Sequence, residues 1–271
     1  MPYSPMELVE AFLKTGELDD ALDAIDQHLS DHPHDDDAHR LRVQIQMRRL
    51  DDSALAPLLD QLDQLSAPTA RDYQTRSVIL ERSGHLSEAC DAMREAHQLV
   101  PDNQRLSERL LDLLMQMQDY EEALALIHAQ NRSWRWLERE GDVLVLMQDD
   151  LQATARYGLA LAQLDNLKAS MREDYLHALM ARMMLARAHA YRRLGHTQVA
   201  REHYQASASI LGNDASISFN LGLLAHIEGK HQEARAICQQ ALDDAPPALR
   251  ASMREALETP PFADLKQQLR L

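Results

Sequence analysis

Small and apolar positions are spaced most regularly between Ala215 and Ala248. After Leu221-Gly222, the small or turn-forming positions are Ala225, Gly229, Ala234, Cys238, Ala241 and Pro246. Residues three or four positions apart share one face of a helix, and small side chains there allow a second helix to approach closely. The stretch therefore predicts two short antiparallel helices joined near Gly229 and ended by Pro246.

The same order of glycine, alanine and proline recurs twice upstream. The two further sets are Gly16, Ala21 and Pro33, and Gly84, Ala89 and Pro101. They lie twice 34 positions apart, which leaves room for one unit over 36–69. That unit has no turn glycine and reads Leu50-Asp51-Asp52-Ser53 instead. Its Pro57 is expected in the first turn of a helix, where proline's missing amide hydrogen is tolerated.

A repeat with this length and residue order resembles the tetratricopeptide repeat, a helix-turn-helix unit of 34 residues. Ser218, Ala225 and Cys238 stand where that family's signature has aromatic residues, so the small residues and Pro246 carry the match. The resemblance covers roughly residues 2–248. It implies an all-α, right-handed superhelical solenoid of about seven repeats plus a C-terminal capping helix. First helices would line a concave groove, which in this family commonly holds a peptide or an extended protein segment.

The repeat frame divides the chain into four expected regions. An N-terminal array over 1–167 has units at 2–35, 36–69, 70–103, 104–133 and 134–167. The fourth unit is short, so the fifth begins near Trp134. Residues 168–180 are an insertion that extends the next helix, predicting one long helix over 171–194 that projects beyond the stack or covers a neighbour.

The C-terminal part of the frame contains two further repeat units, followed by a capping helix and a tail. These units are expected at 181–214 and 215–248. A capping helix with Leu249, Met253 and Leu257 on one face should cover the apolar side that a terminal repeat exposes. Pro260-Pro261 should end that helix, followed by a short helix or tail to Leu271. The groove side of the last unit carries Phe219, Leu223 and His226 but no arginine, so this unit is expected to close the array.

Composition narrows the class of protein. Apolar residues make up 45% of the chain and aromatic residues only 4%, with few β-branched residues, which favours helix throughout. No stretch approaches the roughly 18 apolar residues of a membrane span, and Met1–Pro5 lacks signal-peptide character. A soluble, cytoplasmic protein without membrane contact is expected. The net charge of −15 makes nucleic acid an unlikely partner.

Motifs for catalysis are missing from the sequence. There is no glycine-rich phosphate loop, paired-histidine zinc signature, Cys-x-x-Cys or nucleophile elbow, so we expect no enzyme and no cofactor or metal. His32, His34 and His39 surround three aspartates that could bind a metal, but a solvated turn in which an aspartate caps the next helix is the preferred interpretation. Cys90 and Cys238 are expected as small buried residues rather than a disulfide.

Arginine distribution provides the candidate site. Arginine outnumbers lysine 24 to 4, and fifteen of the 24 fall in predicted first helices. By family geometry the groove-facing positions are Arg40, Gln44, Arg48, Arg71, Gln74, Arg82, Arg105, Arg109, Asp112, Arg135, Arg139, Asp142, Arg182, His189 and Arg193. Forked guanidinium groups bind carboxylates through two hydrogen bonds, so these residues predict a groove for an acidic or carboxylate-bearing protein segment.

The sequence is compatible with other roles for these residues and for the chain. Carboxylates such as Glu138 and Asp142 could satisfy the arginines internally, leaving a nearly neutral face. The long helix over 171–194, with Met171, Met180, Met183 and Met184, could make a partner or self-contact, although packing is the commoner role of such methionines. Trp134 and Trp136 should plug the short junction unless one indole is exposed. The chain could be an oligomeric assembly protein, or the repeat module of a larger enzyme.

Overall fold

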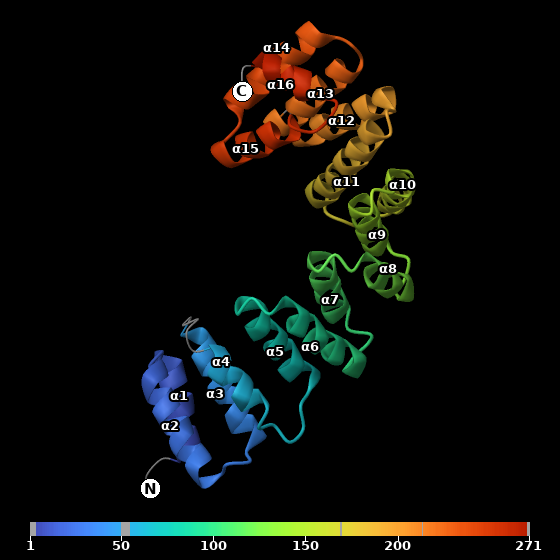
Figure 1. Ribbon diagram of the computed structural model, residues 1–271. Coiled ribbons are helices and arrows are strands. Elements are labelled where there is room, and N and C mark those ends of the chain that lie inside the picture. The colour runs from blue at the N-terminus through green and yellow to red at the C-terminus, as the bar shows by residue number, and fades with distance from the viewer. Residues whose placement is uncertain (1–3, 50–54, 169, 213, 270–271) are drawn as a thin grey trace. The chain divides into compact units, whose positions relative to one another are not determined.

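The computed structural model of the protein describes residues 4–49, 55–168, 170–212 and 214–269. Within these residues the chain forms sixteen α-helices joined by turns, with no strand (Figure 1). The turn expected over 50–53 lies outside the described residues. The chain divides into two compact units, Met1–Leu126 and Ile127–Leu271.

Unit 1 contains three and a half helix pairs. Its helices are α1 (Pro5–Thr15), α2 (Leu18–Asp31), α3 (Asp36–Arg48), α4 (Leu55–Leu62), α5 (Ala70–Arg82), α6 (Leu86–Leu99) and α7 (Gln104–Gln116), followed by the first part of α8 (Tyr120–Ala129). The helix α8, where the sequence predicts a shortened second helix, has ten residues, whereas α2 and α6 have fourteen. Pro57 lies in the first turn of α4, as expected.

Unit 2 contains the remaining pairs and the C-terminal end. Its helices are α9 (Trp134–Leu146), α10 (Asp150–Asn166), α11 (Glu173–Arg193), α12 (Thr197–Leu211), α13 (Ala215–Ile227), α14 (His231–Asp244), α15 (Pro247–Ala256) and α16 (Ala263–Leu269). The helix α9 begins at Trp134, the position where the spacing places the start of the fifth repeat. Within the described residues, each first helix is followed by an antiparallel second helix, which is the predicted all-α repeat architecture.

Local sequence explains where the helices begin. Ser4 and Glu7 form a reciprocal capping box at the start of α1, and Asp35 accepts hydrogen bonds from the Asp37 and Ala38 amides at the start of α3. A side-chain oxygen satisfies amides that the first helical turn leaves without partners. Asp35 therefore has the capping role that the sequence predicts for an aspartate in this turn.

The turns inside the repeats that the structure describes use the left-handed backbone conformation. Gly84, Gly195 and Gly229 adopt it at φ of 77–80°, which costs glycine little. In the fourth and fifth repeats the same position is filled by Gln118 at φ 61° and Gln148 at φ 63°. The turn geometry is thus preserved in repeats that have lost the glycine.

Close helix contact within a pair depends on small residues in the first helix. A Cβ atom on Gly222 would lie 2.5 Å from Cys238 Sγ, and one on Gly141 would lie 2.6 Å from the Tyr157 ring. Distances below 3 Å are prohibitive for carbon atoms, so these two glycines allow α13 to contact α14 and α9 to contact α10 closely. The small-residue pattern in the sequence has this steric cause.

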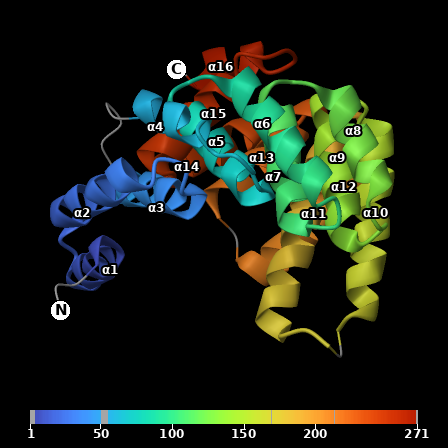
Figure 2. The same ribbon diagram turned by 90° about the horizontal axis from the view of Figure 1, so that it is seen from below.

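The long helix predicted over 171–194 is α11, which has 21 residues. Its additional N-terminal turns are paired rather than isolated, because α10 is also long, at seventeen residues. Leu161 and Leu164 of α10 pack with Leu176 and Leu179 of α11. In Figure 2 the two yellow helices extend side by side. The extension therefore buries its own apolar surface.

The end of unit 2 is covered by α15 and α16. Phe262, Leu265 and Leu269 join Phe219 and Leu223 in one buried cluster, and all five side chains are nearly inaccessible. The helix α16 lies beside α14 (Figure 1). The cap predicted for the terminal repeat is present. It consists of two helices and covers the side of α13 that the sequence suggested would face the groove.

Candidate functional site

The predicted site residues separate into arginines held by carboxylates and arginines that project into solvent. In unit 1, Arg40 Nε lies 3.1 and 3.0 Å from the two carboxylate oxygens of Asp72, and its Nη2 donates to the Ala67 carbonyl at 2.8 Å. Asp72 is only 6% exposed and also accepts from the Thr69 amide at the start of α5. Arg40 therefore ties α3 to the beginning of α5.

Two arginines of α11 connect helices in unit 2 in the same way. Arg182 donates to Glu138 Oε1 of α9 at 2.6 and 2.9 Å, and Arg193 donates to both oxygens of Asp150, the first residue of α10, at 2.5–2.9 Å. Glu138 and Asp150 are each 8% exposed. Burial raises the pKa of the Glu138 carboxyl, and the charge of Arg182 opposes that shift.

Other predicted members are engaged within their own units. Arg109 of α7 forms an ion pair with Glu81 of α5. The Tyr157 hydroxyl donates to Asp142 at 2.8 Å, and Arg139 lies 3.8 Å from the same carboxylate. Burial raises the pKa of both the Tyr157 hydroxyl and the Asp142 carboxyl. Carboxylates near the arginines, the alternative left open by the sequence, account for this part of the predicted site.

His189 has an interior role. The Tyr204 hydroxyl lies 2.9 Å from His189 Nδ1, and the two rings meet edge to face at 5.4 Å. Desolvation, together with the positive charges of Arg192 and Arg193, lowers the pKa of His189 to about 4. His189 is therefore a neutral residue of the α11–α12 contact at physiological pH.

The remaining predicted positions differ in their exposure. Gln44 and Asp112 are half-buried, whereas Gln74 and Arg82 are exposed. Arg48 is the last residue of α3, and it is also exposed. The C-terminal end of a helix carries partial negative charge, so an arginine there is favourable for the helix alone. The position of Arg48 and Arg82 at the ends of α3 and α5 is favourable for these helices.

Three arginines lie where helix electrostatics disfavour them. Arg71, Arg105 and Arg135 are the second residues of α5, α7 and α9, and each is exposed. The N-terminal end of a helix carries partial positive charge, so a cation there costs about 0.3–1 kcal/mol. Among the described residues, none of the three has a carboxylate partner; the Arg135 guanidinium lies 5.1 Å from the Trp134 ring centroid.

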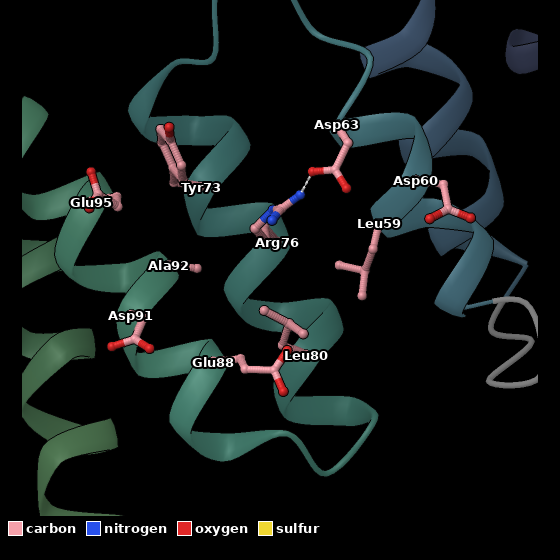
Figure 3. A pocket seen from close by; sticks show the side chains of 10 residues that line it. All are labelled: Leu59, Asp60, Asp63, Tyr73, Arg76, Leu80, Glu88, Asp91, Ala92 and Glu95. Atoms are coloured by element: carbon pink, nitrogen blue, oxygen red, sulfur yellow. Dashed lines mark hydrogen bonds and ion pairs between the residues drawn. The ribbon is translucent and has the colours of Figure 1, made fainter.

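A depression in unit 1 was not anticipated from the sequence. It holds about 520 Å³ and lies between α4, α5 and α6 (Figure 3). Its lining consists of Leu59, Asp60, Asp63, Tyr73, Arg76, Leu80, Glu88, Asp91, Ala92 and Glu95. The available signal was the spacing of Glu88, Asp91 and Glu95, which lie three and four positions apart on one helix face. That pattern is also typical of an ordinary solvated face.

The histidines around Asp35 do not gather into a metal site. His28 Nε2 lies 2.8 Å from Asp35 Oδ2, and His39 Nε2 lies 2.9 Å from the Pro33 carbonyl oxygen. In the part of the chain that the structure describes, no group of three or more His, Cys, Asp or Glu side chains could hold a metal ion. These residues order the turn between the first two repeats.

Both cysteines and both tryptophans belong to the interior. Cys90 and Cys238 are free and fully buried, and burial raises the pKa of the Cys238 thiol to about 12. Trp134 and Trp136 are 9% and 3% exposed, so neither indole is available as an anchor for a peptide. The methionines near the start of α11 pack in the same cluster as Trp134, as the packing interpretation predicts.

Comparison with known proteins agrees with this helix arrangement. A family model described as tetratricopeptide repeat matches residues 185–248. This stretch of unit 2 therefore resembles the tetratricopeptide repeat. The matched segment begins within α11 and ends at the start of α15, so it covers the repeats whose turns contain Gly195 and Gly229. A search of curated protein sequences gives no match.

Several solved structures, two of them named as tetratricopeptide-repeat proteins, share the fold. The C-terminal part of a repeat-containing protein from Cytophaga hutchinsonii superposes with a TM-score of 0.61 at 10% identity, over 88% of this chain and 95% of that chain. A tetratricopeptide repeat protein from Parabacteroides merdae gives 0.55 at 15% identity, over 94% and 98%. PilF from Pseudomonas aeruginosa gives 0.50 at 17%, over 87% and 96%. At such identities the likeness establishes the fold alone.

The described helices were also compared with the requirements for a membrane-spanning helix. Among the described helices, none combines the length and apolar character that crossing a bilayer requires. Tetratricopeptide repeats commonly serve as scaffolds for protein interaction.

Proposed function

We propose that this protein is a non-enzymatic tetratricopeptide-repeat scaffold whose first helices bind an acidic or carboxylate-bearing segment of a partner protein. In unit 1 the binding residues are Arg71 and Arg105, and Arg135 is the corresponding residue of unit 2. The observation that carries the proposal is the position of these arginines at helix N-termini, where they oppose the helix dipole.

The two classes of arginine support this narrower site. Arg40, Arg182 and Arg193 are joined to buried carboxylates of neighbouring helices, so their charge is already compensated. Arg71 and Arg105 are exposed and carry no such compensation among the described residues. An exposed guanidinium keeps its five donors for a carboxylate and can bind it with two parallel hydrogen bonds.

A peptide-display selection tests the proposal. A library of random twelve-residue peptides is selected on the wild-type protein and on the double variant Arg71→Glu, Arg105→Glu. Clones from the wild type should be enriched in Asp and Glu and should bind the double variant at least about tenfold more weakly, because two charge-assisted contacts become repulsive.

A matched control separates the site from overall charge. Arg235 of α14 and Arg254 of α15 are exposed residues outside the first helices of the seven repeats. The variant Arg235→Glu, Arg254→Glu therefore changes the net charge by the same amount as Arg71→Glu, Arg105→Glu does. Acidic clones should bind this control like the wild type. Enrichment without acidic residues, or equal loss of binding in both double variants, would refute the proposed site.

A further inference from the structure

The depression between α4, α5 and α6 has an apolar floor. Leu80 and Ala92 are 4% and 6% exposed, and Leu59 and Tyr73 are half-buried. Figure 3 shows these side chains between the three helices, with carboxylates around them. Floor residues come from all three helices, so the surface is fixed by helix packing rather than by a loop. A volume of about 520 Å³ is in the range of small ligand-binding clefts.

The second helix of the second repeat, which borders the depression, is short. The helix α4 has eight residues, whereas α6 has fourteen. Tyr73, Arg76 and Leu80 recur at intervals of three and four along α5, and therefore form one continuous stripe. A full-length helix in place of α4 would contact more of this stripe. The shortened helix leaves it open to a partner.

Negative charge surrounds the floor. Asp60 and Asp63 lie on or directly after α4, and Glu88, Asp91 and Glu95 lie on α6; all five are exposed. Arg76 is the only cation that lines the depression, and it pairs with Asp63.

The other rim carboxylates are only partly balanced. Arg94 pairs with Asp91 at 2.5 Å, and His85 lies 3.8 Å from Glu88. Among the described residues, Asp60 and Glu95 have no cationic partner. The rim therefore carries uncompensated negative charge on opposite sides, on α4 and on α6.

We propose that this depression binds a basic segment of a partner protein, one that carries lysine or arginine beside apolar residues. The apolar side chains and the aliphatic stems of the basic residues would contact Leu59, Leu80 and Ala92, and the cationic groups would meet Asp60 and Glu95 on the two sides. The Tyr73 ring offers a further face for a guanidinium or ammonium group. Charge complementarity selects this occupant, since an acidic segment would be repelled by the same rim.

This surface is independent of the arginines assigned to acidic partners. Arg71 lies on α5 together with Tyr73 and Leu80, but it does not line the depression. A positive and a negative contact region would let one unit hold two segments of opposite charge. Each region can then be tested by itself.

Fluorescence anisotropy with matched peptides provides the test. Three labelled twelve-residue peptides share the same leucine positions and carry lysine, glutamine or glutamate at all others. The lysine peptide should bind the wild type, and the other two should not. Asp60→Asn combined with Glu95→Gln should weaken lysine-peptide binding about tenfold, because both uncompensated rim charges are removed without a change of shape.

A control of equal charge distinguishes the site from general attraction to an acidic protein. Glu233 of α14 and Glu255 of α15 are exposed. The variant Glu233→Gln, Glu255→Gln therefore also removes two negative charges, but from unit 2 instead of from the rim. This variant should bind the lysine peptide like the wild type. Equal weakening in both variants, or binding that ignores Asp60 and Glu95, would overturn the proposal.

A third variant tests the apolar floor. Leu59→Lys places a cation over the floor and should abolish lysine-peptide binding, while far-ultraviolet circular dichroism confirms retained helix. The Arg71→Glu, Arg105→Glu variant should keep full lysine-peptide binding, so loss of the acidic-segment site and loss of this site give different results. Unchanged binding by Leu59→Lys would overturn the assignment of the floor.

Discussion

Gln148 holds the same left-handed turn at φ 63° that Gly195 holds at φ 77° in the next repeat. Both residues follow directly on the C-cap of a first helix and are followed within two residues by a second helix. A side chain with a Cβ atom loses about 1 kcal/mol in this conformation relative to glycine. The fifth repeat therefore retains its turn at a local cost.

Replacing Gln148 with glycine should stabilise unit 2. We expect Gln148→Gly to increase the free energy of unfolding by about 1 kcal/mol, because the left-handed strain is removed while the turn is unchanged. Urea unfolding followed by tryptophan fluorescence measures this, since both tryptophans of the chain are buried in unit 2. Gly195→Ala serves as the reverse control and should destabilise the same unit. A stability loss in Gln148→Gly would contradict the argument.

Gly222 should tolerate no larger residue while Cys238 is present. We expect Gly222→Ala to lower the unfolding free energy by about 1–3 kcal/mol, since its Cβ would lie 2.5 Å from Cys238 Sγ and 3.3 Å from the Cys238 amide nitrogen. Adding Cys238→Ala removes the sulfur but leaves the backbone contact. The double variant should therefore be more stable than the sum of the two single effects predicts. Strict additivity would show that the clash is not the cause.

His189 should make unit 2 sensitive to acid. Its pKa is about 4 in the folded protein against 6.5 in the unfolded chain, so below pH 6.5 the unfolded chain binds a proton that the folded protein does not. The stabilisation contributed by neutral His189 is complete above pH 6.5 and is lost between pH 6.5 and 4. The total is on the order of 3 kcal/mol.

The variant His189→Asn isolates this effect, because asparagine does not titrate and its oxygen can accept from Tyr204. The unfolding free energy of the wild type minus that of His189→Asn should be constant above pH 6.5 and should fall steadily toward pH 4. Chemical unfolding at several pH values gives both quantities. A difference independent of pH over this interval would contradict the expected shift.

Arg193 should matter for stability, unlike the arginines at helix N-termini. Arg193→Leu leaves the buried Asp150 carboxylate without its cation and should cost about 1–3 kcal/mol. Adding Asp150→Asn should recover part of the loss by removing the unpaired charge. Arg71→Glu and Arg105→Glu should not lower stability, since an acidic residue is favoured in the first helical turn. Urea unfolding followed by circular dichroism compares the four variants. An equal loss of unfolding free energy in all of them would contradict the distinction between the structural Arg193 and the two arginines at helix N-termini.

The sequence was sufficient to predict the repeat architecture for a physical reason. Helix pairing is recorded locally by small residues such as Gly222 and by breakers such as Pro246, both within one 34-residue period. The shortened fourth repeat and the long α11 also follow from local spacing. Gln118 and Gln148 occupy turns that the glycine pattern does not mark, and only neighbouring repeats reveal them.

Side-chain partners could not be predicted in the same way. Arg193 and Asp150 are 43 positions apart, and Arg40 and Asp72 are 32 apart, so their pairing depends on how successive repeats stack. The depression lined by Asp60, Tyr73 and Glu95 depends on where α4 ends relative to two other helices. Charge counted along individual helices carries no information on either arrangement.

Phe262 contacts one residue of each of the last two first helices, since its ring lies 6.0 Å from the His226 ring of α13 and 5.6 Å from the Arg192 guanidinium of α11. With α15 and α16 in place, the surface on which another repeat would stack is already occupied. Growth of such an array by duplication must then insert new repeats ahead of the cap, not after it. A further repeat could stack on this surface only if α15 and α16 were displaced from it.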